Sequence, residues 1–291
     1  MSHFMLYRTA EGPVACRDGV CWALPGGWND WVDSDKLAQK LARHAQDHAA
    51  SPDLDEASLA PLAPLLDQEV WACGVTYRRS REARMEESES AGGGDFYDRV
   101  YTAARPELFL KATAHRVVGP GDDLGLRSDS SWMVPEPELV LVVTSSGEIV
   151  GCTVGNDLSC RDIEGENPLY LPQAKTFDRC AALGPGIRVA EELPGPDTAI
   201  RLSISRGGET VFSGETRLAD MKRTPRELVG FLFRDNSHPG GCLLMTGTGI
   251  VPGDDFALAA GDVMRISIDG IGTLENAVAP LTPGGKGIGL S

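Results

Sequence analysis

The chain has 291 residues, 42% of them hydrophobic, which is enough for one large domain or for one large and one small domain. Its net charge of −15 and the lack of a basic stretch to hold phosphates argue against nucleic acid and anionic membranes as partners. The chain has no run of 18 apolar residues, and its N-terminus lacks the apolar region of a signal peptide. We therefore expect a cytoplasmic protein.

The chain contains seven cysteines, an odd number, and no pair of them has the CxxC spacing. Several lie inside apolar segments, among them Cys73, Cys152 and Cys242. This pattern is typical of reduced, buried thiols in a reducing compartment. We expect reduced thiols here.

The first elements along the chain are short. Apolar stretches at 4–7 and 19–23 predict strands. A helix is predicted over 35–49, with Asp33 or Ser34 as its N-cap and alanine and leucine side chains on its inner face.

The stretch 51–68 is rich in proline and acidic residues and is typical of a linker packed against a following domain. It predicts a small N-terminal α+β domain at 1–65 and a larger domain at 66–291.

The larger domain reads mainly as short strands separated by turns. Hairpin turns are predicted at 145–147, between LVLVVT and EIVGCTV, and at 206–208, between IRLSIS and ETVFSG. A helix is predicted over 225–234, with Thr224 as its cap and Pro225 in its first turn. The expected fold class is α+β, mainly β.

Two carboxylates stand at the start of an apolar strand in VPEPELVLVV, at Glu136 and Glu138. Residues i and i+2 of a strand face the same side, with Cα atoms about 6.5–7 Å apart. Like charges at this distance repel unless a cation lies between them. A solvated strand face near a sheet edge is the alternative.

A third carboxylate, Asp157, ends the strand that pairs with LVLVV through the 145–147 turn. Back-pairing of this hairpin brings Asp157 close to Glu136 and Glu138. Such an all-oxygen set selects Mg²⁺, Mn²⁺ or Ca²⁺ over Zn²⁺. Mg²⁺ is the first choice.

Other catalytic layouts are not supported. The sequence has neither a GxSxG nor an HExxH motif, and its five histidines do not cluster with metal-ligand spacing near acids. His44 and His48 are four positions apart, and we interpret them as part of a solvated helix face. The glycine-rich stretches match neither the Walker nor the Rossmann pattern, so nucleotide binding is not expected.

The motifs PEPEL, NDLSCRD, KTFD with a following GP, and TGTGIVPG occur in this order. On these motifs the chain resembles the fumarylacetoacetate hydrolase superfamily from about Val70 to the last strand. The longer stretches RPELFLKATAHRVVGPG, RSDSSWMVPEPELVLVV and ENPLYLPQAK resemble its 2-keto-3-deoxy-D-arabinonate dehydratase branch. That branch converts a 2-keto-3-deoxy-pentonate to 2,5-dioxopentanoate (α-ketoglutarate semialdehyde) in non-phosphorylative pentose breakdown.

The resemblance implies a mixed β-sandwich roll with a small N-terminal domain, usually as a homodimer. It implies Mg²⁺, with Mn²⁺ as a substitute, at Glu136, Glu138 and Asp157. Lys175 matches the active-site lysine, and Glu107 matches an acid of the dehydratase branch. Without the resemblance, an exposed loop lysine and a surface acid would be expected at these two positions.

The resemblance also implies residues that bind a small 2-oxo acid substrate. Thr248 falls where the family holds the substrate carboxylate, and Arg161 and Glu164 fall where relatives use Arg and Gln. The change from Gln leaves the role of Glu164 open. Lys111 interrupts an apolar run and has no assigned role.

One departure from the family bears on the reaction. Hydrolases of the family carry a histidine just after a Tyr, and Ser80 stands at that position here. A neutral hydroxyl without a paired base is a poor general base. Dehydration is therefore expected. The alternatives are a Mg²⁺-dependent C–C hydrolase of acylpyruvates or 2,4-diketo-3-deoxy sugar acids, and a non-catalytic binding protein, for which an uncompensated acidic cluster would be costly.

Overall fold

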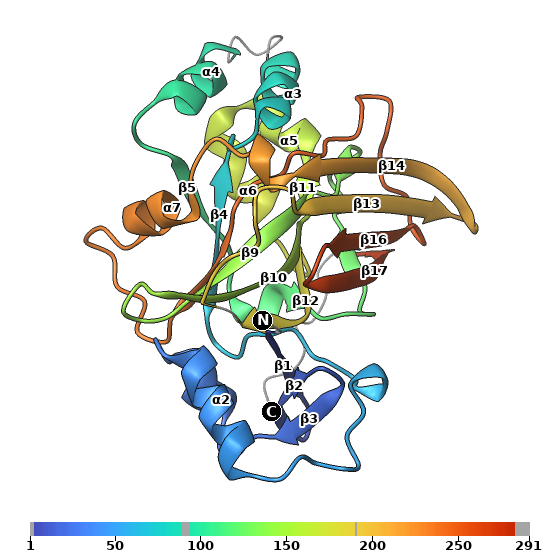
Figure 1. The fold of residues 1–291 in the computed structure, drawn as a ribbon. Coiled ribbons are helices and arrows are strands. Elements are labelled where there is room, and N and C mark those ends of the chain that lie inside the picture. The colour runs from blue at the N-terminus through green and yellow to red at the C-terminus, as the bar shows by residue number, and fades with distance from the viewer. Residues whose placement is uncertain (1–2, 89–93, 190, 283–291) are drawn as a thin grey trace.

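The computed structural model describes residues 3–88, 94–189 and 191–282 (Figure 1). A mixed sheet of ten strands forms its centre. In spatial order its main path runs through β3 (Val20–Ala23), β2 (Gly12–Arg17), β1 (Phe4–Thr9), β12 (Ala181–Val189), β10 (Ile149–Asp157), β9 (Pro137–Val143), β15 (Cys242–Met245), β4 (Glu69–Gly74) and β5 (Glu107–Ala112), with β6 (Val117–Val118) beside β12.

A second sheet of five strands packs against the first. Its order is β14 (Glu209–Arg217), β13 (Ala199–Arg206), β16 (Val263–Ile268), β17 (Gly272–Pro280) and β7 (Leu124–Leu126). β13 contacts β9, and β16 and β17 contact β10. A short pair joins β8 (Met133–Val134) to β11 (Ser159–Cys160).

The hydrophobic core lies between these sheets. Ile200, Leu202 and Ile204 of β13 are buried and alternate with the more exposed Arg201 and Ser203, as in a strand with one face to solvent. β9 is buried along its whole length, which explains the unbroken apolar run from Leu139 to Val143.

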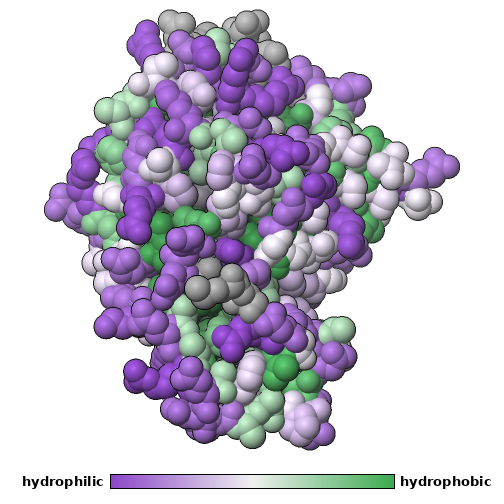
Figure 2. Space-filling model, viewed as in Figure 1, coloured by the Kyte–Doolittle hydropathy of each residue, from purple (hydrophilic) through white to green (hydrophobic). Residues whose placement is uncertain are grey.

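Helices lie around the sheets. They are α1 (Trp28–Val32), α2 (Leu37–Asp47), α3 (Arg78–Ser88), α4 (Gly94–Thr102), α5 (Arg161–Glu166), α6 (Leu171–Lys175) and α7 (Pro225–Leu232), with 3₁₀ turns η1 (Glu56–Ser58), η3 (Ala114–Arg116), η4 (Pro168–Tyr170) and η5 (Leu218–Asp220). In Figure 1, α2 and β1–β3 lie at the end of the molecule opposite α3 and α4. Among the described helices, none has the length and apolar character needed to cross a bilayer. Polar side chains cover most of the face in Figure 2.

Most of the predicted elements are confirmed. The strands at 4–7 and 19–23 appear as β1 and β3, and the 145–147 and 206–208 turns connect the expected hairpins. Thr224 caps α7 by accepting a hydrogen bond from the backbone N–H of Glu227. The fold is α+β and mainly β, as expected. β2 was not predicted as a strand.

The predicted N-cap of the second helix is wrong. α2 begins at Leu37, after Lys36, and no side chain caps it. Asp33 instead accepts hydrogen bonds from the backbone and the hydroxyl of Ser145, at 2.7 and 3.0 Å. Asp35 likewise accepts from Thr144 and Ser146. Both acids thus bind the turn between β9 and β10.

The expectation of reduced thiols is wrong for two of the cysteines. Cys16 and Cys21 lie opposite each other on β2 and β3 and form a disulfide. Antiparallel pairing places their side chains together, a relation that cysteine counting does not show. The other five cysteines are buried free thiols.

The N-terminal residues are joined to the main sheet by backbone hydrogen bonds. β1 pairs with β12, with Phe4 opposite Val189. The three N-terminal strands thus continue the sheet that carries β9 and β10, and the domain division at residue 65 stays a prediction.

Candidate metal centre and active site

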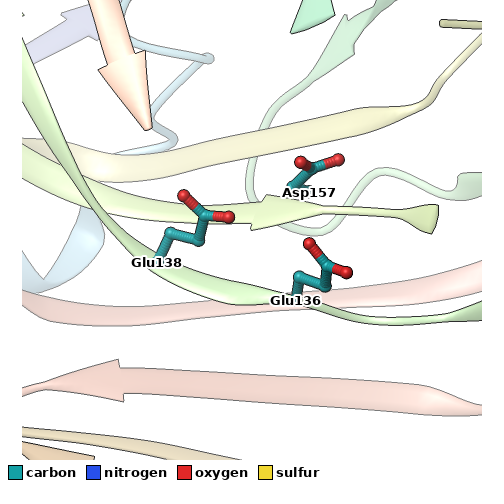
Figure 3. A group of neighbouring side chains, drawn as sticks. All are labelled: Glu136, Glu138 and Asp157. Atoms are coloured by element: carbon teal, nitrogen blue, oxygen red, sulfur yellow. The ribbon is translucent and has the colours of Figure 1, made fainter. Parts of the chain in front are cut away.

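The β9–β10 hairpin brings three carboxylates together. Glu138 lies opposite Gly155, and the backbone N–H of Asp157 donates to the carbonyl of Glu136 at 2.9 Å. Carboxylate oxygens of Glu136, Glu138 and Asp157 lie within 4.8 Å of one another, and all three side chains are buried. In Figure 3 their carboxylates turn toward a common centre. The pairing predicted from the sequence therefore holds, and the solvated-face alternative does not.

Cationic side chains surround this cluster. The ammonium of Lys175, at the end of α6, donates to Glu136 Oε2 at 2.7 Å, to Asp157 Oδ2 at 3.1 Å and to Ser159 Oγ at 2.5 Å. Arg161 Nη2 donates to Glu136 Oε1 at 2.7 Å. Lys175 is 1% exposed, so it is not a loop lysine in solvent. The cluster is held by buried ion pairs.

Glu138 is a buried carboxylate with a raised pKa. Burial raises its pKa well above the usual value, and the charges of Asp157 and Glu136 raise it further. The backbone N–H of Gly247 opposes this by donating to Glu138 Oε2 at 2.5 Å. Gly247 has φ +91°, and a Cβ there would lie 2.0 Å from Thr76 Oγ1, so this approach requires glycine.

The residues present fit a hard divalent cation. All three ligand side chains are carboxylates, the donors that Mg²⁺ and Mn²⁺ prefer. The raised pKa of Glu138 means that the third negative charge is unfavourable until a cation balances it. Within the described part of the chain, no other group of three acidic, histidine or cysteine side chains meets at such distances.

A cavity opens onto the cluster. Polar groups on its wall belong to Glu107, Glu136, Asp157, Glu164, Lys175 and Thr248. Apolar groups on its wall belong to Val75, Phe109 and Leu171. The cavity thus has both charged and apolar groups on its wall. Glu138 and Arg161 do not line it; Arg161 reaches the site through its bond to Glu136.

Glu107 begins β5 and lies opposite Gly74, the last residue of β4. A Cβ at position 74 would lie 1.9 Å from Glu107 Oε2. The missing side chain of Gly74 therefore makes room for this carboxylate. Glu107 is half-buried and faces the cavity, so it is not a surface acid.

Thr248 and Glu164 both line the cavity, and both side chains are buried. Thr248 follows β15, and its hydroxyl donates to the carbonyl of Ile250 at 3.1 Å. Glu164 is 1% exposed, and α5 carries it to the cavity.

Ser80 lines the same cavity near the start of α3. Its hydroxyl donates to the carbonyl of Tyr77 at 2.8 Å and accepts from the backbone N–H of Tyr77 at 3.3 Å. These local bonds engage both the hydrogen and the oxygen of the hydroxyl. The Ser80 hydroxyl is thus bound to the backbone just before the first residue of α3.

Lys111 is a site residue to which sequence reasoning gave no role. Its side chain is fully buried, and Nζ lies 2.7 Å from Asp157 Oδ1. The available signal was a lysine that interrupts the apolar stretch of β5.

The fold and this site define a member of the fumarylacetoacetate hydrolase family. The model of the fumarylacetoacetate (FAA) hydrolase C-terminal domain matches residues 70–279, and the chain belongs to that family.

Two relatives are particularly similar. The chain is 43% identical over 276 residues to the probable 2-keto-3-deoxyxylonate dehydratase of Haloferax volcanii, covering 91% of this chain and 94% of the relative. It is 45% identical over 217 residues to the 2-dehydro-3-deoxy-D-arabinonate dehydratase of Saccharolobus solfataricus, covering 74% and 73%.

Solved structures of a dehydratase of this kind are also similar to this chain. The apo form of 2-keto-3-deoxy-D-arabinonate dehydratase is 33% identical, with a TM-score of 0.82 over 97% of this chain and 100% of that one. The same dehydratase complexed with magnesium and 2,5-dioxopentanoate is 33% identical, with a TM-score of 0.80 over 97% and 99%.

Proposed function

We propose that this protein is a Mg²⁺-dependent hydro-lyase that removes water from a 2-keto-3-deoxy-pentonate and gives 2,5-dioxopentanoate. The observation that carries the proposal is one cavity that joins the buried carboxylate cluster and Lys175 to Glu107. Two relatives named as 2-keto-3-deoxy-pentonate dehydratases, and a neighbour complexed with magnesium and 2,5-dioxopentanoate, support it.

Glu136, Glu138 and Asp157 would hold the cation, and Mn²⁺ suits the same donors. When bound, Mg²⁺ supplies a Lewis acid that polarises the 2-oxo group and makes the C3 hydrogens more acidic. The residues around it bind and orient the substrate. Thr248 receives the substrate carboxylate, and the carboxylate of Glu164 accepts a hydrogen bond from a substrate hydroxyl. Arg161 fixes Glu136.

The elimination needs a base at C3 and an acid at C4. Lys175 is assigned to C3 as the group that accepts the C3 proton, because its Nζ lies at the carboxylate cluster beside Glu136 and Asp157. Glu107 gives its proton to the hydroxyl that leaves C4, so the C4–O bond breaks and water departs. This leaves a C3–C4 double bond with the hydroxyl still on C5. Transfer of a proton from C5 to C3 then gives the C4–C5 enol, which tautomerises to the C5 aldehyde. A positioned acid or base contributes about 10²–10⁴-fold to such a reaction.

C–C hydrolysis requires an activated water, and the contacts of Ser80 speak against it. Its hydroxyl is bound to the backbone of Tyr77 at both hydrogen and oxygen. A hydroxyl so engaged does not serve as a general base.

The test is a turnover assay with 2-keto-3-deoxy-pentonate and Mg²⁺, run beside acetylpyruvate. Wild type is compared with a Glu136→Ala/Glu138→Ala variant. Formation of 2,5-dioxopentanoate that requires the metal and is lost in the variant supports the proposal. Cleavage of acetylpyruvate, without dehydration, would refute it in favour of a hydrolase.

We further propose a homodimer that works in the cytoplasm, as the family resemblance implies, with residues 1–65 as a separate small domain. Light scattering of the purified protein would then give twice the chain mass of 31.0 kDa. A mass of one chain would contradict the dimer.

A further inference from the structure

Strand β5 presents three side chains to the active site. Glu107 and Phe109 lie two residues apart in the regularly paired part of β5 and so point to the same side, and Lys111 follows where the pairing of β4 with β5 shifts register. Glu107 and Phe109 line the cavity. Lys111 lies deeper, is fully buried, and does not line the cavity.

The ammonium of Lys111 makes three contacts with oxygen atoms. Nζ lies 2.7 Å from Asp157 Oδ1 and donates to the carbonyl of Leu158 at 2.8 Å. It also donates to the backbone carbonyl of Lys175. Two of these contacts are hydrogen bonds to backbone carbonyls, and the third is a buried ion pair with Asp157.

These contacts join two parts of the site that are separate in the sequence. Asp157 is the last residue of β10, and Lys175 is the last residue of α6. One nitrogen from a third element therefore fixes a carboxylate of the metal cluster and the backbone of the proposed base. Asp157 is held at both oxygens, by Lys111 at Oδ1 and by Lys175 at Oδ2.

We propose that Lys111 is a positioning residue, which sets the orientation of the Asp157 carboxylate and the place from which Lys175 reaches the substrate. This inference rests on the proposed dehydratase function. Lys111 acts through these two residues and does not touch the substrate.

The decisive variant is Lys111→Met. It keeps nearly the length of the side chain and removes the positive charge and the three N–H donors. Loss of groups that orient metal ligands typically costs about 10–100-fold in affinity or activity. We expect kcat at saturating Mg²⁺ to fall by about this factor. Calorimetric titration of the substrate-free variant with Mg²⁺ should still show a filled site, because loss of orientation is offset by removal of a repelling charge.

The matched control is Thr153→Val. Thr153 is fully buried on β10 and donates to the carbonyls of Gly184 and Gly186, away from the cavity. The Thr153→Val variant measures how the loss of buried hydrogen bonds alone changes the melting temperature and kcat. We expect it to lower the melting temperature and to leave kcat within about twofold of wild type.

A second variant, Lys111→Arg, covers the case in which Lys111→Met does not fold. It retains a buried positive charge, but its planar fork cannot serve three oxygens around one nitrogen. We expect a folded protein with kcat reduced by about tenfold or more.

Four results would overturn the proposal: wild-type kcat in Lys111→Met at saturating Mg²⁺, wild-type kcat in Lys111→Arg, an equal loss of kcat in Thr153→Val, or a folded Lys111→Met that does not bind Mg²⁺. Wild-type enzyme is measured in the same assay. If wild type itself does not dehydrate the substrate, the function is refuted, whereas an active Lys111→Met refutes only the positioning role.

Discussion

The carboxylate of Glu107 occupies the space that a side chain at Gly74 would take. The two residues are paired across β4 and β5, and a Cβ on Gly74 would lie 1.9 Å from Glu107 Oε2. The place of the proposed acid is thus set by the residue opposite it.

This relationship predicts the effect of Gly74→Ala. The added methyl group must displace the Glu107 carboxylate, so we expect kcat to fall by about 10²-fold, within the range of a misplaced general acid. The matched control is Gly230→Ala in α7, where a new Cβ meets no atom within 4 Å. Steady-state kinetics of both variants provide the measurement. Equal activity of Gly74→Ala and wild type would exclude Glu107 as the acid.

The raised pKa of Glu138 predicts how Mg²⁺ stabilises the protein at different pH values. A carboxyl pKa that is higher in the folded than in the unfolded chain favours the metal-free fold at low pH, and this contribution is lost as pH rises through the folded pKa. Mg²⁺ binds the ionised carboxylate and offsets the loss. The increase in melting temperature caused by Mg²⁺ should therefore be larger at pH 8 than at pH 5.5.

Glu138→Gln is the control for this prediction. A neutral amide does not repel Asp157 and Glu136, so we expect a higher melting temperature than wild type at pH 8 without metal, by about 2 °C for each kcal/mol gained. In this variant the increase in melting temperature caused by Mg²⁺ should be smaller than in wild type, and it should depend little on pH. A wild-type response that shrinks toward pH 8 would contradict the argument.

The all-oxygen donor set predicts the order of metals. Protein treated with EDTA should lose turnover, and both Mg²⁺ and Mn²⁺ should restore it, since both prefer carboxylate ligands. Zn²⁺, which prefers nitrogen and sulfur donors, should restore less. Rates measured at equal concentrations of each metal give the answer, and a higher rate with Zn²⁺ than with Mg²⁺ would rule out the proposed site.

Removal of the Cys16–Cys21 disulfide should lower the stability of the fold and leave the catalytic activity unchanged. The two cysteines are separated by five positions, and closing so short a loop stabilises a fold by about 2 kcal/mol. The Cys16→Ser/Cys21→Ser variant should melt earlier by a few degrees and keep the kcat/KM of wild type. Thermal denaturation with and without reductant provides an independent check, because only wild type should respond to the reductant.

Local sequence patterns were sufficient where the contacts are local. The 145–147 turn fixes the pairing of β9 with β10, and pairing alone brings Asp157 to Glu136 and Glu138. The alternation of a strand is likewise enough to place Phe109 and Glu107 on one face. The metal cluster was predictable for this reason.

Contacts between distant segments account for the failures. Asp33 has the chemistry of an N-cap, but Ser145 binds it from 112 positions away. Lys111 could be recognised as unusual, whereas its contact with Asp157 depends on how β5 and β10 pack. β2 was missed because its opening Gly-Pro is typical of a turn, and without β2 the pairing of Cys16 with Cys21 was hidden.

The pairing of β1 with β12 also has a consequence for biosynthesis. Phe4 is translated long before Val189, the residue at the end of β12 with which it pairs. β1 therefore cannot pair with β12 until residue 189 has been translated. Sheets closed by such distant partners fold slowly, because the entropy of a long loop is lost before the contact forms. Until β12 has been made, β1 therefore has an unpaired edge that another strand could bind.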